Sequence, residues 1–258
     1  VGTSHIAALY DNQSLYQHFS DVGFGRKTGS GVSGEQNKAI KPADKWSKLD
    51  RAVMSYGYAI TANLLQMAQG YTIFTAGGKL MPATIYKQTQ TPKGTQVIKP
   101  ETAKQMREMM VSITRKGGTG QDGAVPGYDV AAKTGTARKA SAGGYADKYR
   151  ASFVGFAPAQ NPRLIVAVSI DEPRGKGYYG GTVACVPRDY GGRAEKIRRE
   201  THLCERRTRS QRCQKTIAPC NDLCGTLGAA KVFLLIGSLK TVAPAFSRLF
   251  RLPCVSPR

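Results

Sequence analysis

The sequence has no long hydrophobic run. No stretch reaches the ~18 consecutive apolar residues that a membrane-spanning helix needs, and the apolar stretch near the end, Val232–Ile236, is far too short. An initiator methionine and a signal-type leader are also missing, so we expect a fragment without its N-terminal part. With 41% apolar and 21% charged residues in a 258-residue chain, the composition argues against disordered, collagenous and coiled-coil proteins.

Cysteine is absent from residues 1–184, and all six cysteines follow, at Cys185, Cys204, Cys213, Cys220, Cys224 and Cys254. A cysteine-free stretch fits an oxidising periplasm, where stray thiols would pair. The six cysteines do not form the paired C-x2-C spacing of a zinc site, even with His202 added. His5 and His18 have no candidate ligands near them in the sequence, so we predict no metal and no cofactor.

Acidic residues are scarce: 17 Asp and Glu stand against 38 Lys and Arg, a net charge of +21. Residues 185–258 hold 15 of the basic and only 5 of the acidic residues, and they show no clear helical or strand period. We therefore divide the chain at residue 184. The tail has three interpretations: a disordered basic tail, a Cys/His metal module, or sequence translated out of frame, and we favour the last.

Such a charge also raises a nucleic-acid-binding protein as an alternative. No helix-turn-helix, RNP or zinc signature accompanies the charge, and nearly half of the excess lies in the tail. We therefore expect no specific nucleic acid as a partner.

Residues 1–184 change from a helical to a strand pattern. Helical periodicity runs from Leu49 to Gly78. A second helix is predicted from Pro100 to about Thr114, with a buried stripe of Met106, Met109, Met110 and Ile113. Strands are predicted at Tyr128–Ala137, Ala151–Ala157 and Leu164–Ile170, the last two antiparallel neighbours and the last a central strand covered on both faces. This order predicts an α+β fold, with an antiparallel sheet flanked by helices.

The motif that carries chemistry is Lys133-Thr134-Gly135, followed by Thr136, at the end of a predicted strand. K-T-G is an element of penicillin-binding proteins and class A β-lactamases. A cation, two hydroxyls and a glycine on an edge strand form a surface that can receive a carboxylate, and glycine lets a ligand backbone approach closely. A three-residue motif alone recurs by chance.

Longer motifs surround it, and with them residues 1–184 resemble the transpeptidase domain of class B penicillin-binding proteins, closest to the division-specific septal enzymes. The resemblance rests on Val1-Gly-Thr-Ser-His-Ile6, Val22-Gly-Phe-Gly-Arg-Lys-Thr-Gly29, Ser55-Tyr-Gly-Tyr58, Leu64-Leu-Gln-Met-Ala68, Gly117-Gly-Thr-Gly120, Ala132–Lys139, Phe153–Pro158, Ile170-Asp-Glu-Pro173 and Gly177-Tyr-Tyr-Gly-Gly181. It implies the penicillin-binding protein/β-lactamase fold and a serine-type D,D-transpeptidase that cross-links peptidoglycan stem peptides and is acylated by β-lactams.

The family's site combines three motifs, S-x-x-K, S-x-N and K-[ST]-G, and only the third is present here. The nearest match to the first is Ser112-Ile-Thr-Arg115, in which a permanently protonated arginine replaces the base. In the family a segment like Val1-Gly-Thr-Ser4 follows S-x-N directly, so we expect the chain to start just past that motif. The chain by itself is therefore predicted to be inactive.

The resemblance also implies roles for individual residues. The backbone N–H of Thr136 would be an oxyanion-hole donor, the hydroxyls of Thr134 and Thr136 would bind the carboxylate, and Lys133 would support the proton network and the carboxylate field. Arg138 and Tyr149 would lie beside the site. Tyr178 and Tyr179 would form an aromatic wall.

For the whole protein the family implies an N-terminal anchor in the inner membrane, a catalytic domain in the periplasm, and membrane proteins of the division machinery as partners. Its members continue after Tyr-Tyr-Gly-Gly with an Ala-x-Pro-x-Phe segment and a helix, which this sequence replaces at Cys185. A β-lactamase or β-lactam sensor of the same fold is an alternative, although Ser55-Tyr-Gly-Tyr58 and Gly177-Tyr-Tyr-Gly-Gly181 favour the transpeptidase.

Overall fold

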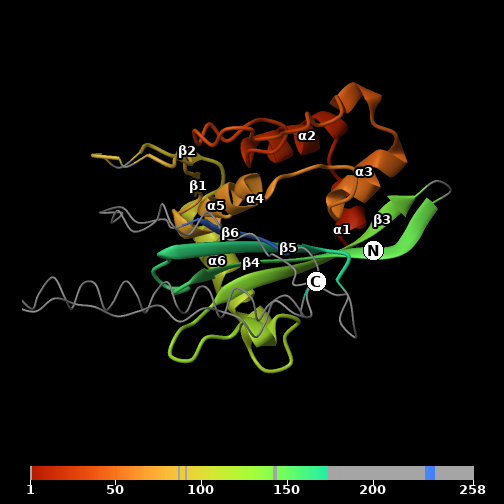
Figure 1. Ribbon diagram of the computed structural model, residues 1–258. Coiled ribbons are helices and arrows are strands. Elements are labelled where there is room, and N and C mark those ends of the chain that lie inside the picture. The colour runs from red at the N-terminus through yellow and green to blue at the C-terminus, as the bar shows by residue number, and fades with distance from the viewer. Residues whose placement is uncertain are drawn as a thin grey trace, which may run out of the picture.

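A computed structural model of the chain describes residues 2–86, 88–90, 92–141, 144–173, 180 and 230–235. Helices and loops make up the first part of the described chain, and an antiparallel sheet makes up the second, as Figure 1 shows. The predicted α+β fold class is confirmed.

The first helices are α1 (Gly2–Ala8), α2 (Asn12–Asp21), the 3₁₀ turn η1 (Ala43–Lys45) and α3 (Lys48–Ser55). Residues of α2 and α3 pack around Trp46, and α1 contacts α3. Asp11 caps α2 by accepting the N–H of Ser14 at 2.7 Å, which satisfies a donor that has no partner inside the helix. Trp46 is buried with Ile40 and Met54, and the apolar residues of α2 cover them.

The single helical pattern predicted from Leu49 to Gly78 is wrong, because the chain leaves the helix after α3. Gly57 and Ala59 have positive φ angles of 94° and 61°, which a right-handed helix does not allow. The helix restarts as α4 (Leu64–Gly70), followed by α5 (Thr72–Thr75). Asn63 begins α4 with a capping box, accepting the N–H of Gln66 while Gln66 accepts the N–H of Asn63.

A two-stranded ribbon, β1 (Lys79–Leu80) and β2 (Thr95–Gln96), leads to α6 (Pro100–Val111) and η2 (Ser112–Thr114). Pro100 occupies the first turn of α6, where its missing N–H costs little. The predicted methionine stripe is only partly correct: Met110 is buried, but Met109 is 58% exposed. The buried face of α6 consists instead of Ala103, Met110 and Val111.

The main sheet has the order β3-β4-β5-β6, and each neighbouring pair is antiparallel. After η3 (Gln121–Gly123), the strands are β3 (Ala131–Ser141), β4 (Gly144–Ala157), β5 (Leu164–Asp171) and β6 (Ala230–Leu235). The predicted antiparallel neighbours are therefore confirmed as β4 and β5. The strand predicted to begin at Tyr128 begins three residues later in the structure, at Ala131. Before it, residues 125 and 128 form only an isolated bridge.

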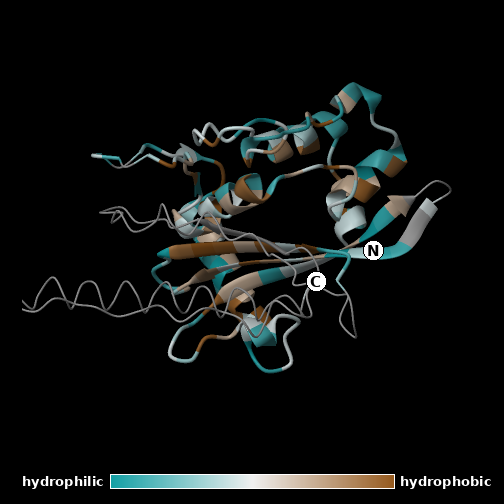
Figure 2. Ribbon diagram, in the orientation of Figure 1, coloured by the Kyte–Doolittle hydropathy of each residue, from teal (hydrophilic) through white to brown (hydrophobic). Residues whose placement is uncertain are grey.

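The core forms where α4 and α6 meet one face of this sheet. Its buried residues are Ala68, Met110, Val111, Ala131, Val154, Phe156, Ala159, Ile165 and Ala167. Figure 2 shows the apolar residues concentrated on the central strands. Six of the eight side chains of β5 are buried, and they alternate between the two faces, as predicted for a central strand. Removing this apolar surface from water holds helices and sheet together.

The cysteine-rich tail contributes one element to the described structure, the strand β6. This strand pairs with β5 from Ile165↔Leu235 to Ile170↔Ala230. All six cysteines lie outside the described residues. Across the part of the chain that the structure describes, no helix combines the length and the apolarity that crossing a bilayer requires.

Candidate functional site: the K-T-G strand

The candidate site lies along β3, which among the described strands forms one edge of the sheet. Arg138 of β3 stands opposite Tyr149 of β4, yet their backbone groups point away from each other. The N–H of Arg138 donates to the hydroxyl of Tyr58 at 2.9 Å, and the carbonyl of Tyr149 accepts from Glu172 beyond β4. Because antiparallel pairs alternate, Thr136, two residues before Arg138, also points its N–H to the outer edge.

The side chains of the motif project from both faces of β3. Alternation along the strand puts Thr134 and Thr136 on one face and Lys133 on the other. The Lys133 ammonium donates to the carbonyl of Thr134 at 2.7 Å. The Thr134 and Thr119 hydroxyls lie 3.1 Å apart, and the Thr136 hydroxyl accepts the N–H of Gly180 at 2.8 Å. Two hydroxyls, an ammonium and a backbone N–H therefore come together along three residues of β3.

Gly135 and Gly180 lie where the chain packs closely against itself. A Cβ at residue 135 would lie 2.6 Å from the Ser152 Oγ, and one at residue 180 would lie 2.6 Å from the Gly135 carbonyl oxygen. A distance below 3.0 Å forces a neighbour to shift, and at residue 180 the neighbours are backbone atoms that cannot move easily, whereas at residue 135 the Ser152 side chain would have to move. Gly180 therefore permits the contact with β3 that brings part of the Gly177–Gly181 motif to the K-T-G strand.

Arg138, Tyr149 and Asp147 form a small polar group next to Thr136. The Arg138 guanidinium lies 5.8 Å from the centre of the Tyr149 ring, a distance at which cation and ring attract each other. The Tyr149 hydroxyl donates to the Asp147 carboxylate at 3.0 Å, and an Arg138 nitrogen lies 3.9 Å from the same oxygen. Arg138 places a cation beside the motif, and the Asp147 carboxylate lies close enough to offset its charge.

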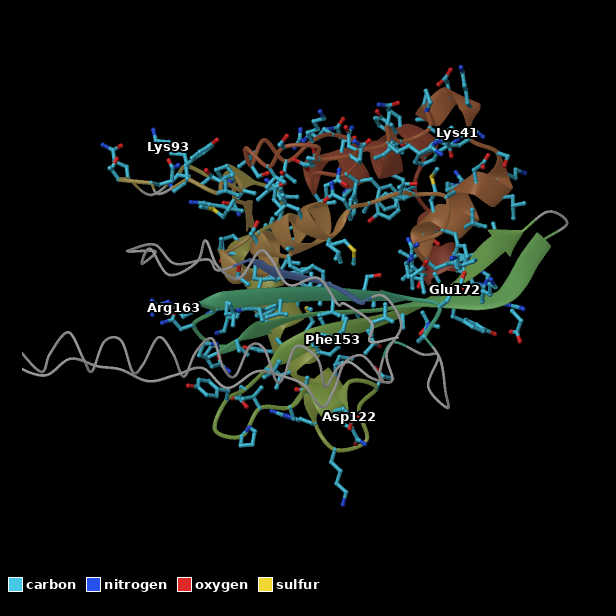
Figure 3. All side chains as sticks on the ribbon, in the orientation of Figure 1. Lys41, Lys93, Asp122, Phe153, Arg163 and Glu172 are labelled. Atoms are coloured by element: carbon cyan, nitrogen blue, oxygen red, sulfur yellow. The ribbon has the colours of Figure 1, made fainter. Side chains whose placement is uncertain are left out.

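An ion-pair network ties β3, β4 and β5 together behind this group. The Lys139 ammonium lies 3.0 Å from Asp171 and 2.7 Å from Glu172. Arg150 also binds Asp171, and Lys148 binds Glu172. The hydrogen bonds from Lys139 hold the pKa of both carboxyl groups below their ordinary values, and the same bonds, led by that to Glu172, raise the pKa of Lys139. Figure 3 shows Glu172 near the end of the sheet where β3 and β4 continue as a hairpin.

The structure brings together most of the residues predicted from the sequence. Six of the eight lie on β3 or directly opposite it: Lys133, Thr134, Gly135, Thr136, Arg138 and Tyr149. Tyr178 and Tyr179 lie outside the described residues.

Three residues that touch this group were not predicted. Tyr58 bonds the backbone of Arg138, Thr119 contacts Thr134, and Asp147 joins Arg138 to Tyr149. Tyr58 and Thr119 belong to motifs that carried the family resemblance, Ser55–Tyr58 and Gly117–Gly120, and membership in those motifs was the available signal. Asp147 had no signal, because its importance depends on how the hairpin folds.

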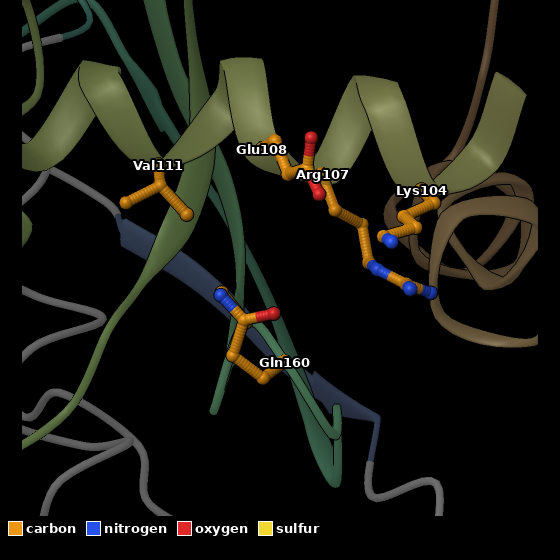
Figure 4. Close-up of a pocket in the computed structure, with 6 residues that line it drawn as sticks. Lys104, Arg107, Glu108, Val111 and Gln160 are labelled. Carbon is orange, nitrogen blue, oxygen red and sulfur yellow. The ribbon is translucent and has the colours of Figure 1, made fainter. Parts of the chain in front are cut away.

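A shallow depression elsewhere offers less chemistry. Figure 4 shows it between α6 and the turn after β4; its lining residues are Lys104, Arg107, Glu108, Val111, Ala159 and Gln160. Arg107 is used structurally, because it donates to the carbonyl of Phe74 at 2.9 Å. None of the K-T-G residues line this depression. Within the described ranges, no three His, Cys, Asp or Glu side chains gather as a metal site requires.

The fold and the K-T-G edge are those of a known family. The model of the penicillin-binding protein transpeptidase domain matches residues 1–185, and the chain belongs to this family. A probable peptidoglycan D,D-transpeptidase, PenA of Neisseria flavescens, is 50% identical over 185 residues, which are 71% of this chain and 46% of the relative. The peptidoglycan D,D-transpeptidase FtsI of Escherichia coli K12 is 35% identical over 71% of this chain and 32% of its own.

Solved structures agree with this assignment. The transpeptidase domain of penicillin-binding protein 3 from Burkholderia pseudomallei superposes with a TM-score of 0.67 and 39% identity, covering 74% of this chain and 60% of that one. Penicillin-binding protein 3 from Mycobacterium tuberculosis, in complex with aztreonam, gives a TM-score of 0.70 and 29% identity, covering 77% and 49%. The chain thus spans less than half the length of the curated relatives that it matches.

Proposed function

We propose that this chain supplies the K-T-G part of a serine-type D,D-transpeptidase site, which cross-links peptidoglycan stem peptides during septal cell-wall synthesis. The observation that carries the proposal is the edge of β3. There the N–H of Thr136 points outward beside two threonine hydroxyls and the Lys133 ammonium. These are the donors that a carboxylate and a developing oxyanion need.

The proposed chemistry assigns one task to each group. A serine oxygen attacks the carbonyl carbon before the last residue of a stem peptide, and the Thr136 N–H stabilises the negative charge that develops on the carbonyl oxygen. The hydroxyls of Thr134 and Thr136, with Arg138, bind the terminal carboxylate, and Lys133 supports the proton network. The terminal residue leaves, and an amine of a second stem peptide then attacks the acyl-enzyme. One oxyanion donor contributes about 3 kcal/mol to transition-state stabilisation.

A chimera tests the proposal, because this sequence contains no S-x-x-K and no S-x-N. The part of the N. flavescens relative that precedes the matched segment is joined to the whole of this chain, so that β6 is kept in the sheet; in the family this preceding part carries S-x-x-K and S-x-N. We expect the chimera to become covalently labelled by a fluorescent penicillin. The 258-residue chain should stay unlabelled.

Lys133→Ala in the chimera provides the matched test of the edge. We expect the rate of labelling to fall by at least tenfold, because the lysine charge next to the β-lactam carboxylate is lost. The exposed Lys79→Ala on β1 serves as the control and should leave the rate unchanged. Equal labelling of the Lys133→Ala chimera and its parent would overturn the proposed role of the strand.

The alternative function within this fold is that of a β-lactamase or β-lactam sensor. The same chimera separates a transpeptidase from a β-lactamase, since a transpeptidase keeps the penicilloyl group for long periods whereas a β-lactamase releases it and turns over; a sensor would also keep the group but would not join two stem peptides. We expect a stable acyl-enzyme. The names of the relatives, all D,D-transpeptidases among those compared above, support this expectation.

The cellular setting follows from the same proposal. We place the site in the periplasm, on a protein anchored in the inner membrane and associated with membrane proteins of the division machinery. β-Lactams are the proposed inhibitors, supported by the aztreonam and ampicillin complexes of the M. tuberculosis relative. Neither a cofactor nor a specific nucleic acid takes part in the proposed reaction.

For the tail, we propose that residues 185–258 are translated out of frame. The family match ends at residue 185, where the cysteines and the denser positive charge begin. Sequencing the coding DNA tests this: a one-base shift after Ala184 should restore an Ala-x-Pro-x-Phe segment. A coding frame in which no shift restores that segment would overturn the proposal.

A further inference from the structure

The hairpin of β3 and β4 contains an irregularity directly after Arg138. The register passes from Arg138↔Tyr149 to Ala140↔Tyr145, so one residue of β3 faces three residues of β4, 146–148. Such a bulge bends its strand and redirects the side chains that it carries. Asp147 is the middle residue of the three.

The ion-pair network fixes both sides of this bulge. Lys139, the β3 residue inside it, binds Asp171 and Glu172, and Lys148, next to Asp147, binds Glu172 at 3.3 Å. Glu172 also donates its backbone N–H to the carbonyl of Tyr149 at 2.9 Å. The bulge is therefore held at Lys139 on β3 and directly after Asp147 on β4.

Asp147 itself is exposed and faces the candidate site. Its side chain is 88% exposed, and one carboxylate oxygen accepts the Tyr149 hydroxyl while lying 3.9 Å from Arg138. The other cations of this hairpin pair instead with Asp171 or Glu172. Among the described ion pairs, Asp147 is the carboxylate partner of Arg138.

We propose that the Asp147 carboxylate is an internal substitute for the ligand carboxylate. It pairs with Arg138 and Tyr149 while the site is empty, and an incoming carboxylate must displace it from Arg138. The inference rests on the proposed function, in which Arg138 helps bind the terminal carboxylate. Asp147 is then a specificity-determining residue, because it competes with carboxylate ligands and not with neutral ones.

The ion pair between Arg138 and Asp147 is weak enough for a ligand carboxylate to displace Asp147. An exposed ion pair is screened by water and salt, and such pairs change equilibria only modestly. Arg138 is 48% exposed, so both partners meet this condition. Removing the Asp147 charge should therefore tighten carboxylate binding by about two- to fivefold.

The test uses the full 258-residue chain with ¹⁵N labelling. N-acetyl-D-alanyl-D-alanine is titrated into the wild type, Asp147→Asn and Asp44→Asn, and binding is followed at the amide of Thr136 and the side-chain Nε of Arg138. Asp44→Asn removes the same charge from η1 and serves as the control. The C-terminal amide of the dipeptide, which has no carboxylate, serves as the control ligand.

We expect Asp147→Asn alone to bind the acid more tightly, to bind the amide unchanged, and to shift the Arg138 Nε signal before ligand is added. Saturable binding of the acid with equal affinity in all three proteins would overturn the inference and leave the proposed function standing. Equal tightening in Asp44→Asn would also overturn it, because total charge would then be the cause. No saturable response in any of the proteins would overturn the carboxylate site and this inference together.

Discussion

Thr136 presents two separate polar groups at the candidate site. Its backbone N–H points outward from the edge strand, because Arg138, two residues later, donates in that direction. Its hydroxyl lies on one face of the strand and accepts the N–H of Gly180 at 2.8 Å. A substitution can therefore remove the hydroxyl and leave the N–H in place.

Thr136→Val in the chimera makes that separation. Valine keeps the β-branched shape and the N–H but removes the hydroxyl. A hydrogen bond to a charged group contributes about 1.5–3 kcal/mol, so we expect penicillin labelling to slow by about ten- to hundredfold. Stopped-flow or quenched-gel measurement of the acylation rate checks this.

Thr95→Val on the exposed strand β2 makes the same chemical change away from the site, and it should not alter the rate. If both variants acylate like the parent, the Thr136 hydroxyl has no part in ligand binding.

Among the elements, the β3–β4 hairpin is held by ion pairs at its outer end, beyond Arg138. Lys139 links two carboxylates of the β5 end to the bulge. The pKa values of Asp171 and Glu172 are lowered, chiefly by hydrogen bonds from Lys139, so their stabilisation is present above their ordinary values of 3.8 and 4.5 and is lost as the pH falls through the folded values. The pKa of Lys139 is raised above 10.5, so its stabilisation is lost only as the pH rises through that higher value.

Lys139→Met should therefore loosen the hairpin at neutral pH. The amide of Glu172, bonded to the Tyr149 carbonyl, is the reporter for hydrogen exchange. We expect its protection factor to fall by about two- to fivefold in the variant, within the range for exposed ion pairs. As the pH falls below the ordinary pKa values of 3.8 and 4.5 and through the lower folded values, the wild type should approach the variant, because the two carboxylates become protonated.

Lys41→Met is the control for this experiment. It breaks an ion pair of similar geometry with Asp50, 3.0 Å long, near α3. A wild-type protection factor that stays constant down to pH 2 would show that the network does not hold the bulge.

For the molecule as a whole, the net charge is read directly from the composition, but it does not identify a specific binding partner. The net charge of +21 is divided almost equally between residues 1–184 and the much shorter tail. A dense positive charge attracts any polyanion, and such attraction weakens steeply with salt. Specific recognition needs an element that reads base edges, and the described fold is that of a transpeptidase.

We therefore expect the whole chain to bind DNA weakly and without sequence preference. Filter binding should show affinity that falls as the salt concentration rises, and deletion of residues 185–258 should remove most of it. A sequence preference in the intact chain, or unchanged affinity after the deletion, would contradict the expectation. Unrelated duplexes of equal length provide the control.

Sequence reasoning located much of the fold because several signals were local. Pro100 marked the start of α6, and the apolar run Leu164–Ile170 identified a strand buried on both faces. The helical pattern from Leu49 to Gly78 failed, because periodicity gave no warning of the left-handed Ala59. The predicted burial of Met109 was wrong for a related reason, since a helical stripe does not show which of its two sides packs against the sheet.

The sequence by itself determined the chemistry of the site, since Lys133, Thr134, Gly135 and Thr136 are consecutive on one strand and their alternation is fixed by the pleat. Only the tertiary structure decided their partners. Tyr58 meets Arg138 across 80 positions of sequence, Thr119 meets Thr134 across 15, and Asp147 reaches Arg138 through a bulge. Contacts of this kind depend on packing between elements and on register, which are settled when the whole chain buries its apolar surface and not by neighbouring residues.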